Sequence, residues 1–286
     1  MTIERVTVAG GGTLGAQSAL QFALNKKDVM IFGRSEESIE RAKRRLEVFA
    51  RKYSEETAFG QKEIGAASAA IRFTSDPSEA FTDCDLIFEC TSESIPTKQE
   101  VLSLIEKHSD GTEAIIATNS STFLPSKLSE FLNDGSRFLA VHLANEIWKR
   151  DTAEIMPHPG TLPEVNEKVA QFVTEVGLVP IPLHKEHPGY LLNSLLVPWL
   201  RAGLDLAAKG VAEPQNVDLV WERVMGAEGP FRAIDIIGLR TTAAILSLEV
   251  EAGIPGSREI VEYIKTNYLD KGRFGVENGK GFYDYV

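Results

Sequence analysis

Residues 6–24 read VTVAGGGTLGAQSALQFAL, an apolar run that passes through the glycine pattern Gly10-x-Gly12-x-x-Gly15 into a stretch of good helix formers. In such a turn the first glycine permits a tight bend, the second lets a pyrophosphate approach the backbone, and the third allows close packing. The helix N-terminus offers N–H groups to the phosphates. Glycine clusters also form ordinary turns, but here a strand and a helix flank the pattern. The stretch therefore predicts a dinucleotide site contacted by Gly10, Gly12, Thr13, Leu14 and Gly15.

Outward from this unit, short apolar runs alternate with helical patterns as far as residue 183. The expected strands after the first are 29–32, 71–74, 86–89, 114–118, 138–142, 153–156 and 179–183. The expected helices include 36–52, 97–107 and 163–176, with a helix-turn excursion at 53–70. Strands that alternate with helices build a mostly parallel sheet covered on both faces. The predicted fold class is therefore α/β, a Rossmann-type doubly wound sheet.

Beyond residue 187 the pattern becomes almost entirely helical. Helices are expected at 190–209, 214–225, 231–252 and 257–268. We therefore expect two domains, an NAD(P)-binding domain at 1–186 and a helical substrate and dimerisation domain at 187–286. The apolar helices of the second domain carry more apolar surface than one thin layer can bury, which favours a homodimer. The residues that suggest this are Leu195, Leu196, Trp199, Leu200 and the segment 234–248. Alternatively, these helices close a monomeric core.

Composition narrows the class of protein and its location. The formal net charge of −11 disfavours binding to nucleic acid or to an anionic membrane surface. No apolar run approaches the roughly 18 residues that span a bilayer, and no signal peptide is recognised, so we expect a cytoplasmic protein. Cys84 and Cys90 are the two cysteines, too few for a disulfide framework. His158, His184 and His187 lack metal-ligand spacing, so no metal is expected.

The end of the second strand bears on the cofactor. An acidic residue about 20 positions past the glycines binds the ribose 2′-OH of NAD, whereas an arginine accommodates the 2′-phosphate of NADP. Here the segment reads Gly33-Arg34-Ser35, without a carboxylate. Arg34 and Ser35 are suited to a phosphate, so NADP is favoured over NAD. Alternatively, Arg34 lies against adenine or in solvent and Glu36 or Glu37 contacts the ribose.

Several motifs in order resemble the L-3-hydroxyacyl-CoA dehydrogenase family, and the resemblance covers essentially the whole chain. Besides the glycine pattern, the motifs are Thr118-Asn119-Ser120-Ser121, His142, Glu154, Pro188-Gly189-Tyr190-Leu191-Leu192-Asn193, Gly229-Pro230-Phe231 and Gly279-Lys280-Gly281-Phe282-Tyr283. The intervals of 21 residues from Ser121 to His142 and 12 from His142 to Glu154 match those of the family. The resemblance implies an oxidoreductase of fatty acid metabolism that interconverts 3-hydroxyacyl-CoA and 3-oxoacyl-CoA, with a short acyl chain expected.

The resemblance also implies roles for individual residues. His142 is expected to be the acid/base, as suits an imidazole near neutrality. Glu154 is expected to orient its ring, and Ser121 and Asn193 to hold the substrate oxygen and thioester. Glu93, Lys98 and Asn119 match the contacts of the family with the nicotinamide-side ribose. Ser121 and Asn193 could instead cap helices.

One departure from the family pattern concerns the substrate. The family follows its histidine with two aromatic residues, asparagine and proline, but this chain reads His142-Leu143-Ala144-Asn145. Three cations could meet CoA phosphates: Arg51, Lys52 and Lys62. Their positive field is weakened by the nearby carboxylates of Glu55, Glu56 and Glu63. Two alternatives therefore stay open. One is a dehydrogenase of a free 3-hydroxy acid of the sugar acid or carnitine type, and the other is an inactive dinucleotide-binding protein.

Overall fold

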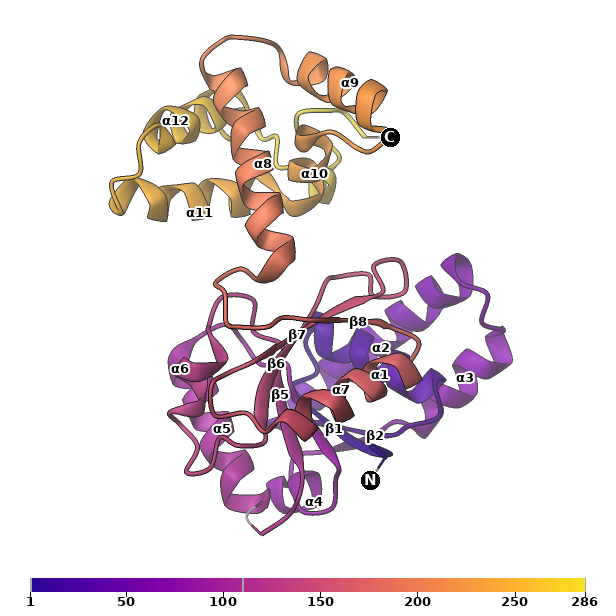
Figure 1. Ribbon diagram of the computed structural model, residues 1–286. Coiled ribbons are helices and arrows are strands. Elements are labelled where there is room, and N and C mark those ends of the chain that lie inside the picture. Colours follow the sequence, from indigo (N-terminus) through magenta and orange to yellow (C-terminus); the bar gives the residue numbers. More distant parts are fainter. Residues whose placement is uncertain (1, 110, 286) are drawn as a thin grey trace. The chain divides into compact units, whose positions relative to one another are not determined.

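The computed structural model describes residues 2–109 and 111–285 (Figure 1). Contacts between residues divide the chain into two compact units, Met1–Leu191 and Leu192–Val286. The division falls inside helix α8 (Tyr190–Ala208), a few residues beyond the boundary expected at 186/187.

An eight-stranded sheet forms the centre of the first unit, in the order β3-β2-β1-β4-β5-β6-β7-β8. The strands are β1 (Arg5–Ala9), β2 (Asp28–Phe32), β3 (Arg72–Thr74), β4 (Leu86–Glu89), β5 (Ile115–Thr118), β6 (Phe138–Leu143), β7 (Thr152–Pro157) and β8 (Val179–Pro182). Every neighbouring pair is parallel except β6 and β7. The segment between Leu143 and Thr152 is too short for a crossover helix, which explains the reversal. The prediction of a mostly parallel, Rossmann-type sheet is confirmed.

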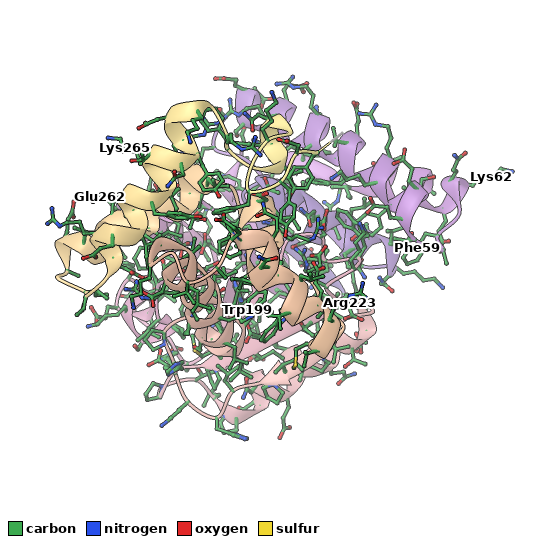
Figure 2. All side chains as sticks on the ribbon, turned by 90° about the horizontal axis from the view of Figure 1, so that it is seen from above. Phe59, Lys62, Trp199, Arg223, Glu262 and Lys265 are labelled. Carbon is green, nitrogen blue, oxygen red and sulfur yellow. The ribbon has the colours of Figure 1, made fainter. Side chains whose placement is uncertain are left out.

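Helices cover both faces of this sheet (Figure 1). One buried cluster joins the sheet to α1 (Thr13–Leu24), α2 (Glu36–Glu56), α3 (Gln61–Ala70) and α7 (Pro163–Glu175). A second cluster joins the other face to α4 (Pro77–Phe81), α5 (Ile95–Ser109) and α6 (Pro125–Ser129). The excursion expected at 53–70 consists of the end of α2 and the whole of α3. Figure 2 shows Phe59 and Lys62 at the outer end of this helical pair.

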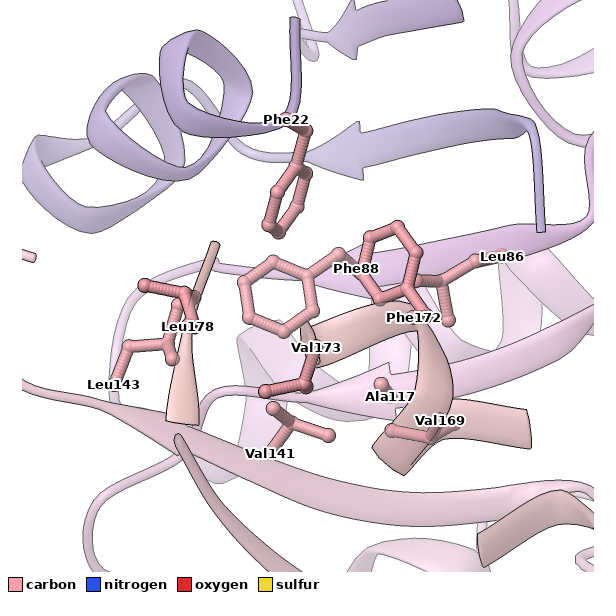
Figure 3. A pocket seen from close by; sticks show the side chains of 10 residues that line it. All are labelled: Phe22, Leu86, Phe88, Ala117, Val141, Leu143, Val169, Phe172, Val173 and Leu178. Atoms are coloured by element: carbon pink, nitrogen blue, oxygen red, sulfur yellow. The ribbon is translucent and has the colours of Figure 1, made fainter. Parts of the chain in front are cut away.

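A small void lies in the first of these clusters (Figure 3). Its volume is about 10 Å³, and ten apolar side chains surround it. Phe22 packs edge-on against Phe88 and Phe172, with ring centroids 5.6 Å and 5.1 Å apart. A void of this size holds at most about one water molecule, and apolar voids stay dry. It is a packing feature of the core and no ligand site.

Five helices make up most of the second unit: α8, α9 (Pro214–Met225), α10 (Pro230–Ile237), α11 (Leu239–Glu251) and α12 (Ser257–Asn267). Short 3-10 turns follow at Leu269–Lys271 and Val276–Asn278. The prediction of one helix over 231–252 is wrong, because Gly238 has φ +96°, which no continuous α-helix adopts. A core with buried Phe231 and Phe282 holds the unit together. No described helix is long and apolar enough to cross a membrane.

The apolar residues expected to pair two chains separate into two groups. Leu200 is buried in the core of the unit, and Leu196 and Trp199 pack against that core, so these three side chains close the core of the unit itself. Leu195 is 75% exposed and Leu248 is 65% exposed. The unit therefore buries some of these apolar side chains by itself and leaves others, among them Leu195 and Leu248, exposed.

Candidate active site

The glycine turn between β1 and α1 has the geometry that a dinucleotide needs. Gly10 has φ +111°, and a Cβ there would lie 2.8 Å from the carbonyl oxygen of Cys90. A Cβ at Gly15 would lie 1.9 Å from the carbonyl oxygen of Gly10, so the helix approaches the turn more closely than a side chain permits. A Cβ at Gly12 would meet only the Cys90 oxygen, at 3.8 Å. Open space thus remains at Gly12, where α1 begins without a side-chain cap, and a phosphate fits there.

At the end of β2, a side chain at position 33 would be crowded by the start of α2. A Cβ at Gly33 would lie 2.6 Å from Ser38 Oγ and 2.9 Å from Ile39 Cγ1. The side chain of Arg34 is 61% exposed and lies 3.5 Å from Glu100. Ser35 caps α2, and its hydroxyl accepts the N–H of Ser38 at 3.2 Å. The exposed guanidinium of Arg34 can turn toward a ligand. The hydroxyl oxygen of Ser35 already accepts one hydrogen bond, from the N–H of Ser38.

A cationic groove lies beside the glycine turn. Its volume is about 320 Å³, and its lining consists of Thr13, Arg41, Arg44, Arg45, Val48 and Phe49. Arg45 donates to the carbonyl oxygen of Gly11 at 3.3 Å. In a chain with net charge −11, this group of arginines is a local field that attracts phosphates. Sequence reasoning missed it, although the run of arginines in α2 is a visible signal.

Lys98, expected at the nicotinamide-side ribose, is buried and joins the buried Glu89 to Glu93, whose side chain is 35% exposed. Lys98 is 1% exposed, and its Nζ lies 2.8 Å from Glu89 and 3.4 Å from Glu93. Glu89, fully buried at the end of β4, also accepts the hydroxyl of Thr118 at 2.6 Å. Sequence reasoning missed Glu89, although an acid at the end of a buried strand is a recognisable signal. Asn119 accepts the N–H of Leu143 at 3.0 Å and so ties the loop after β5 to β6.

Glu93 holds the loop that carries Ser121. Its carboxylate accepts the hydroxyl of Ser120 at 2.5 Å and the N–H of Thr122 at 2.9 Å. Burial works to raise the pKa of Glu93, but these hydrogen bonds and the charge of Lys98 outweigh burial and lower it. Glu93 is therefore ionised at neutral pH and fixes the residue on either side of Ser121.

Ser121, His142 and Glu154 lie close together. Ser121 is in the loop after β5, His142 is near the end of β6, and Glu154 is near the start of β7. His142 and Glu154 are direct partners in the antiparallel register of β6 and β7. His142 Nδ1 lies 2.9 Å from Glu154 Oε2, and His142 Nε2 lies 3.2 Å from Ser121 Oγ. Both members of the pair are nearly buried, His142 at 6% and Glu154 at 5% exposure. The carboxylate can hold the Nδ1 proton, so that Nε2 is free to exchange a proton on the Ser121 side.

Tyr190 packs on this group, and sequence reasoning assigned it no role. Its ring stacks on the imidazole of His142 with centroids 4.5 Å apart and planes 18° apart. Its hydroxyl donates to the carbonyl oxygen of Ser120 at 2.6 Å. The N–H of Leu191 donates to Glu154 Oε1 at 2.7 Å. From the motif in which only Asn193 was expected to act, Tyr190 and Leu191 thus contact His142, Ser120 and Glu154.

The helix-cap alternatives for Ser121 and Asn193 are wrong. The next helix after Ser121 is α6, whose N-cap is Leu124. Asn193 lies inside α8, beyond its first residue, and belongs to the second unit. Ser121, His142 and Glu154 all belong to the first unit. Among the residues that the structure describes, no group of three or more His, Cys, Asp and Glu could hold a metal ion.

Comparisons with known proteins agree with this geometry. The model of the 3-hydroxyacyl-CoA dehydrogenase NAD-binding domain matches residues 5–187, and that of the C-terminal domain matches residues 189–285. The mitochondrial hydroxyacyl-coenzyme A dehydrogenase of Homo sapiens is 26% identical over 291 residues, covering 99% of this chain and 91% of that protein.

Two further relatives have other names. A solved structure described as a diketoreductase that acts on dicarbonyl compounds is 40% identical, with a TM-score of 0.95 and coverage of 100% of both chains. A 5-formyl-3-hydroxy-2-methylpyridine 4-carboxylate 5-dehydrogenase of Mesorhizobium japonicum is 25% identical, covering 99% of this chain and 91% of that protein. The family models together span nearly the whole sequence, so the chain belongs to the 3-hydroxyacyl-CoA dehydrogenase family of oxidoreductases, with an N-terminal domain of the NAD-binding type.

Proposed function

We propose that this chain interconverts a 3-hydroxy and a 3-oxo carbonyl compound, with His142 as the acid/base. The observation that carries the proposal is the relay from Ser121 through His142 to Glu154, with contacts of 3.2 Å and 2.9 Å. An imidazole held by a carboxylate on one nitrogen and facing a hydroxyl with the other is suited to proton transfer.

The relay residues have separable roles in the proposed reaction. When bound, a nicotinamide dinucleotide supplies the hydride donor or acceptor. In the oxidation direction, His142 Nε2 takes the proton of the substrate hydroxyl, and Glu154 balances the imidazolium that forms. In the reduction direction, the same nitrogen returns the proton. Ser121 Oγ, 3.2 Å from His142 Nε2, is proposed to hydrogen-bond the reacting oxygen, and Asn193 is proposed to hold the substrate.

The proposed cofactor site follows the glycine turn and the buried network. Backbone at Gly10, Gly12, Thr13, Leu14 and Gly15 would hold the pyrophosphate, and Glu93, Lys98 and Asn119 the nicotinamide-side ribose. Lys98 is already paired with Glu89, so its part is to fix the acidic residues of this region. We propose NADP over NAD because Gly33 leaves no room for a carboxylate and because Arg34, Ser35 and the cationic groove favour a phosphate.

We consider two substrate classes, and we place a CoA-free dicarbonyl compound or 3-hydroxy acid first. The relative described as a diketoreductase is 40% identical to this chain, whereas the human hydroxyacyl-CoA enzyme is 26% identical. The sequence Leu143-Ala144-Asn145 after His142 also departs from the family pattern. Further along this segment, Trp148 donates to Glu56 of α2 at 2.6 Å and Lys149 pairs with Glu56 at 3.0 Å. The short-chain CoA thioester predicted from the sequence is the second candidate.

The assembly and location are part of the proposal. We propose a homodimer formed through the second unit, because exposed apolar side chains such as Leu195, Val224 and Leu248 need cover. We propose residues 1–186 as the nucleotide-binding domain and 187–286 as the substrate and dimerisation domain. A cytoplasmic location is proposed on the two free thiols of Cys84 and Cys90, which suit a reducing compartment.

A matched substrate panel tests the function. The free acid, the ethyl ester and the CoA thioester of 3-oxobutanoate are each offered with NADPH and with NADH, and initial rates are measured. We expect turnover of the CoA-free compounds and a higher kcat/KM with NADPH. A higher kcat/KM for the thioester would select the second substrate class. No turnover of any 3-oxo compound, together with tight dinucleotide binding, would identify an inactive binding protein and overturn the proposal.

A further inference from the structure

Tyr190 and the peptide N–H that follows it lie against the relay formed by Ser121, His142 and Glu154. Tyr190 is 1% exposed and stacks on His142. Its hydroxyl donates to the carbonyl oxygen of Ser120, and the N–H of Leu191 donates to Glu154. From these contacts we propose that Tyr190 is a positioning residue that sets the orientation of the His142 imidazole. The proposal rests on the function proposed above.

The stack acts on the ring of His142 in two ways. The planes lie 18° from parallel with centroids 4.5 Å apart, so the imidazole cannot rotate about its Cβ–Cγ bond without displacing Tyr190. Both nitrogens are therefore kept in line with Glu154 and Ser121. The π-face of the phenol also attracts a cation, so it favours the imidazolium form that the oxidation step produces.

The hydroxyl of Tyr190 acts on the loop that carries Ser121. It donates to the carbonyl oxygen of Ser120, while Glu93 accepts the hydroxyl of the same residue. Burial raises the pKa of Tyr190 well above its ordinary value, and the charges of Glu93, Glu154 and Glu89 act in the same direction. The phenol therefore remains a hydrogen-bond donor throughout the working pH range.

The backbone at Tyr190 adopts an unusual conformation to make these contacts. Its φ is +54°, directly after Gly189 with φ +82°. A bulky residue rarely occupies this left-handed region, and it does so where surrounding contacts hold it. The stack, the hydroxyl contact and the small buried cluster with Ala140, Met156 and Leu183 are those contacts. The conformation is consistent with a residue held in place for the site.

Two substitutions separate the ring from the hydroxyl. Tyr190→Phe keeps the stack and removes the donor, and we expect kcat to fall about 3- to 10-fold. Tyr190→Leu removes the stack, and we expect kcat to fall about 10²-fold because small misplacements of reacting groups are costly. In both variants KM for the dinucleotide should stay unchanged. Tyr53→Phe is the matched control, because its phenol is fully buried and donates to Gln21 at 2.8 Å.

The pH profile distinguishes positioning from mere stability. Among the described contacts, the groups that face the His142 ring are Glu154, Ser121 and Tyr190. Loss of the π-face disfavours the imidazolium, so in Tyr190→Leu the acidic limb of the profile for oxidation should move to lower pH by about half a unit. An NMR titration of the His142 ring should show the same displacement and needs no substrate.

The outcomes decide the inference independently of the reaction. An unmoved NMR midpoint in a folded Tyr190→Leu variant, or kcat losses no larger than those of Tyr53→Phe, would overturn it. If Tyr190→Leu does not fold, the kcat of Tyr190→Phe relative to Tyr53→Phe decides. An inactive wild-type protein would refute the proposed function, while the NMR midpoint would still report whether Tyr190 controls the ring.

Discussion

Replacing Glu154 by glutamine removes a charge and keeps the size of the side chain. The two carboxylate oxygens have separate partners, His142 Nδ1 at 2.9 Å and the N–H of Leu191 at 2.7 Å. A glutamine offers one oxygen and one NH₂ group to these two places. If its oxygen stays with Leu191, its NH₂ group faces Nδ1 and drives the ring proton to Nε2. That tautomer cannot accept a proton from a substrate hydroxyl.

The lost charge sets the magnitude of the effect. Two unit charges about 4 Å apart attract by about 4 kcal/mol at an effective dielectric constant of about 20. In the oxidation direction the imidazole becomes protonated only as it takes the substrate proton, so this attraction stabilises the transition state relative to the enzyme before proton transfer. His142 and Glu154 are 6% and 5% exposed, so solvent screens the pair little. Since about 1.4 kcal/mol corresponds to a factor of ten, we expect kcat to fall about 10²- to 10³-fold.

Initial rates of oxidation at saturating substrate measure this loss, and circular dichroism checks the fold. Binding of NADPH and NADH should not change, because Glu154 has no proposed contact with the dinucleotide. Glu106→Gln is the control, since that carboxylate accepts hydrogen bonds from Asn133 on the surface, and its rates should match the wild type. A folded Glu154→Gln enzyme with a kcat within about threefold of the wild type would refute the assignment of an ion pair in the transition state.

Three further predictions address the base, the cofactor and the second unit. His142→Ala should leave the Kd for the dinucleotide nearly unchanged and lower kcat by about 10²- to 10⁴-fold; wild-type turnover would remove His142 from the mechanism. Arg34→Asp should weaken NADPH relative to NADH by about tenfold or more in paired titrations, and an unchanged ratio would contradict the 2′-phosphate assignment. Burial raises the pKa of Asp235, although the N–H groups of Phe282 and Tyr283 donate to its carboxylate and act to lower the pKa. Its proton-linked contribution is therefore complete below the unfolded value of about 3.9 and is lost as pH rises through the folded value. The Tm of the wild type minus the Tm of Asp235→Asn should therefore fall from about pH 4 to pH 7, and a rise over this range would contradict the argument.

Much of the first unit was predictable because its signals are local. The glycine turn, the strand 86–89 and the two-sided helical cover follow from spacing within short windows. The break at Gly238 was missed because a helical apolar pattern continues through it, and only the backbone conformation there shows that two helices meet. Leu195 and Leu200 are both leucines of α8, yet Leu200 is buried and Leu195 is exposed.

Residue order alone determined the Rossmann-type fold and the family, and it predicted Ser121, His142 and Glu154 as site residues, since all of these depend on motifs and intervals along the chain. The tertiary structure alone decides that β6 and β7 pair antiparallel, which sets His142 directly opposite Glu154. It likewise pairs Lys98 with Glu89 and brings Tyr190 against an imidazole 48 residues earlier in the chain. The physical reason is that such contacts depend on strand order, register and close packing, which no local window of sequence contains.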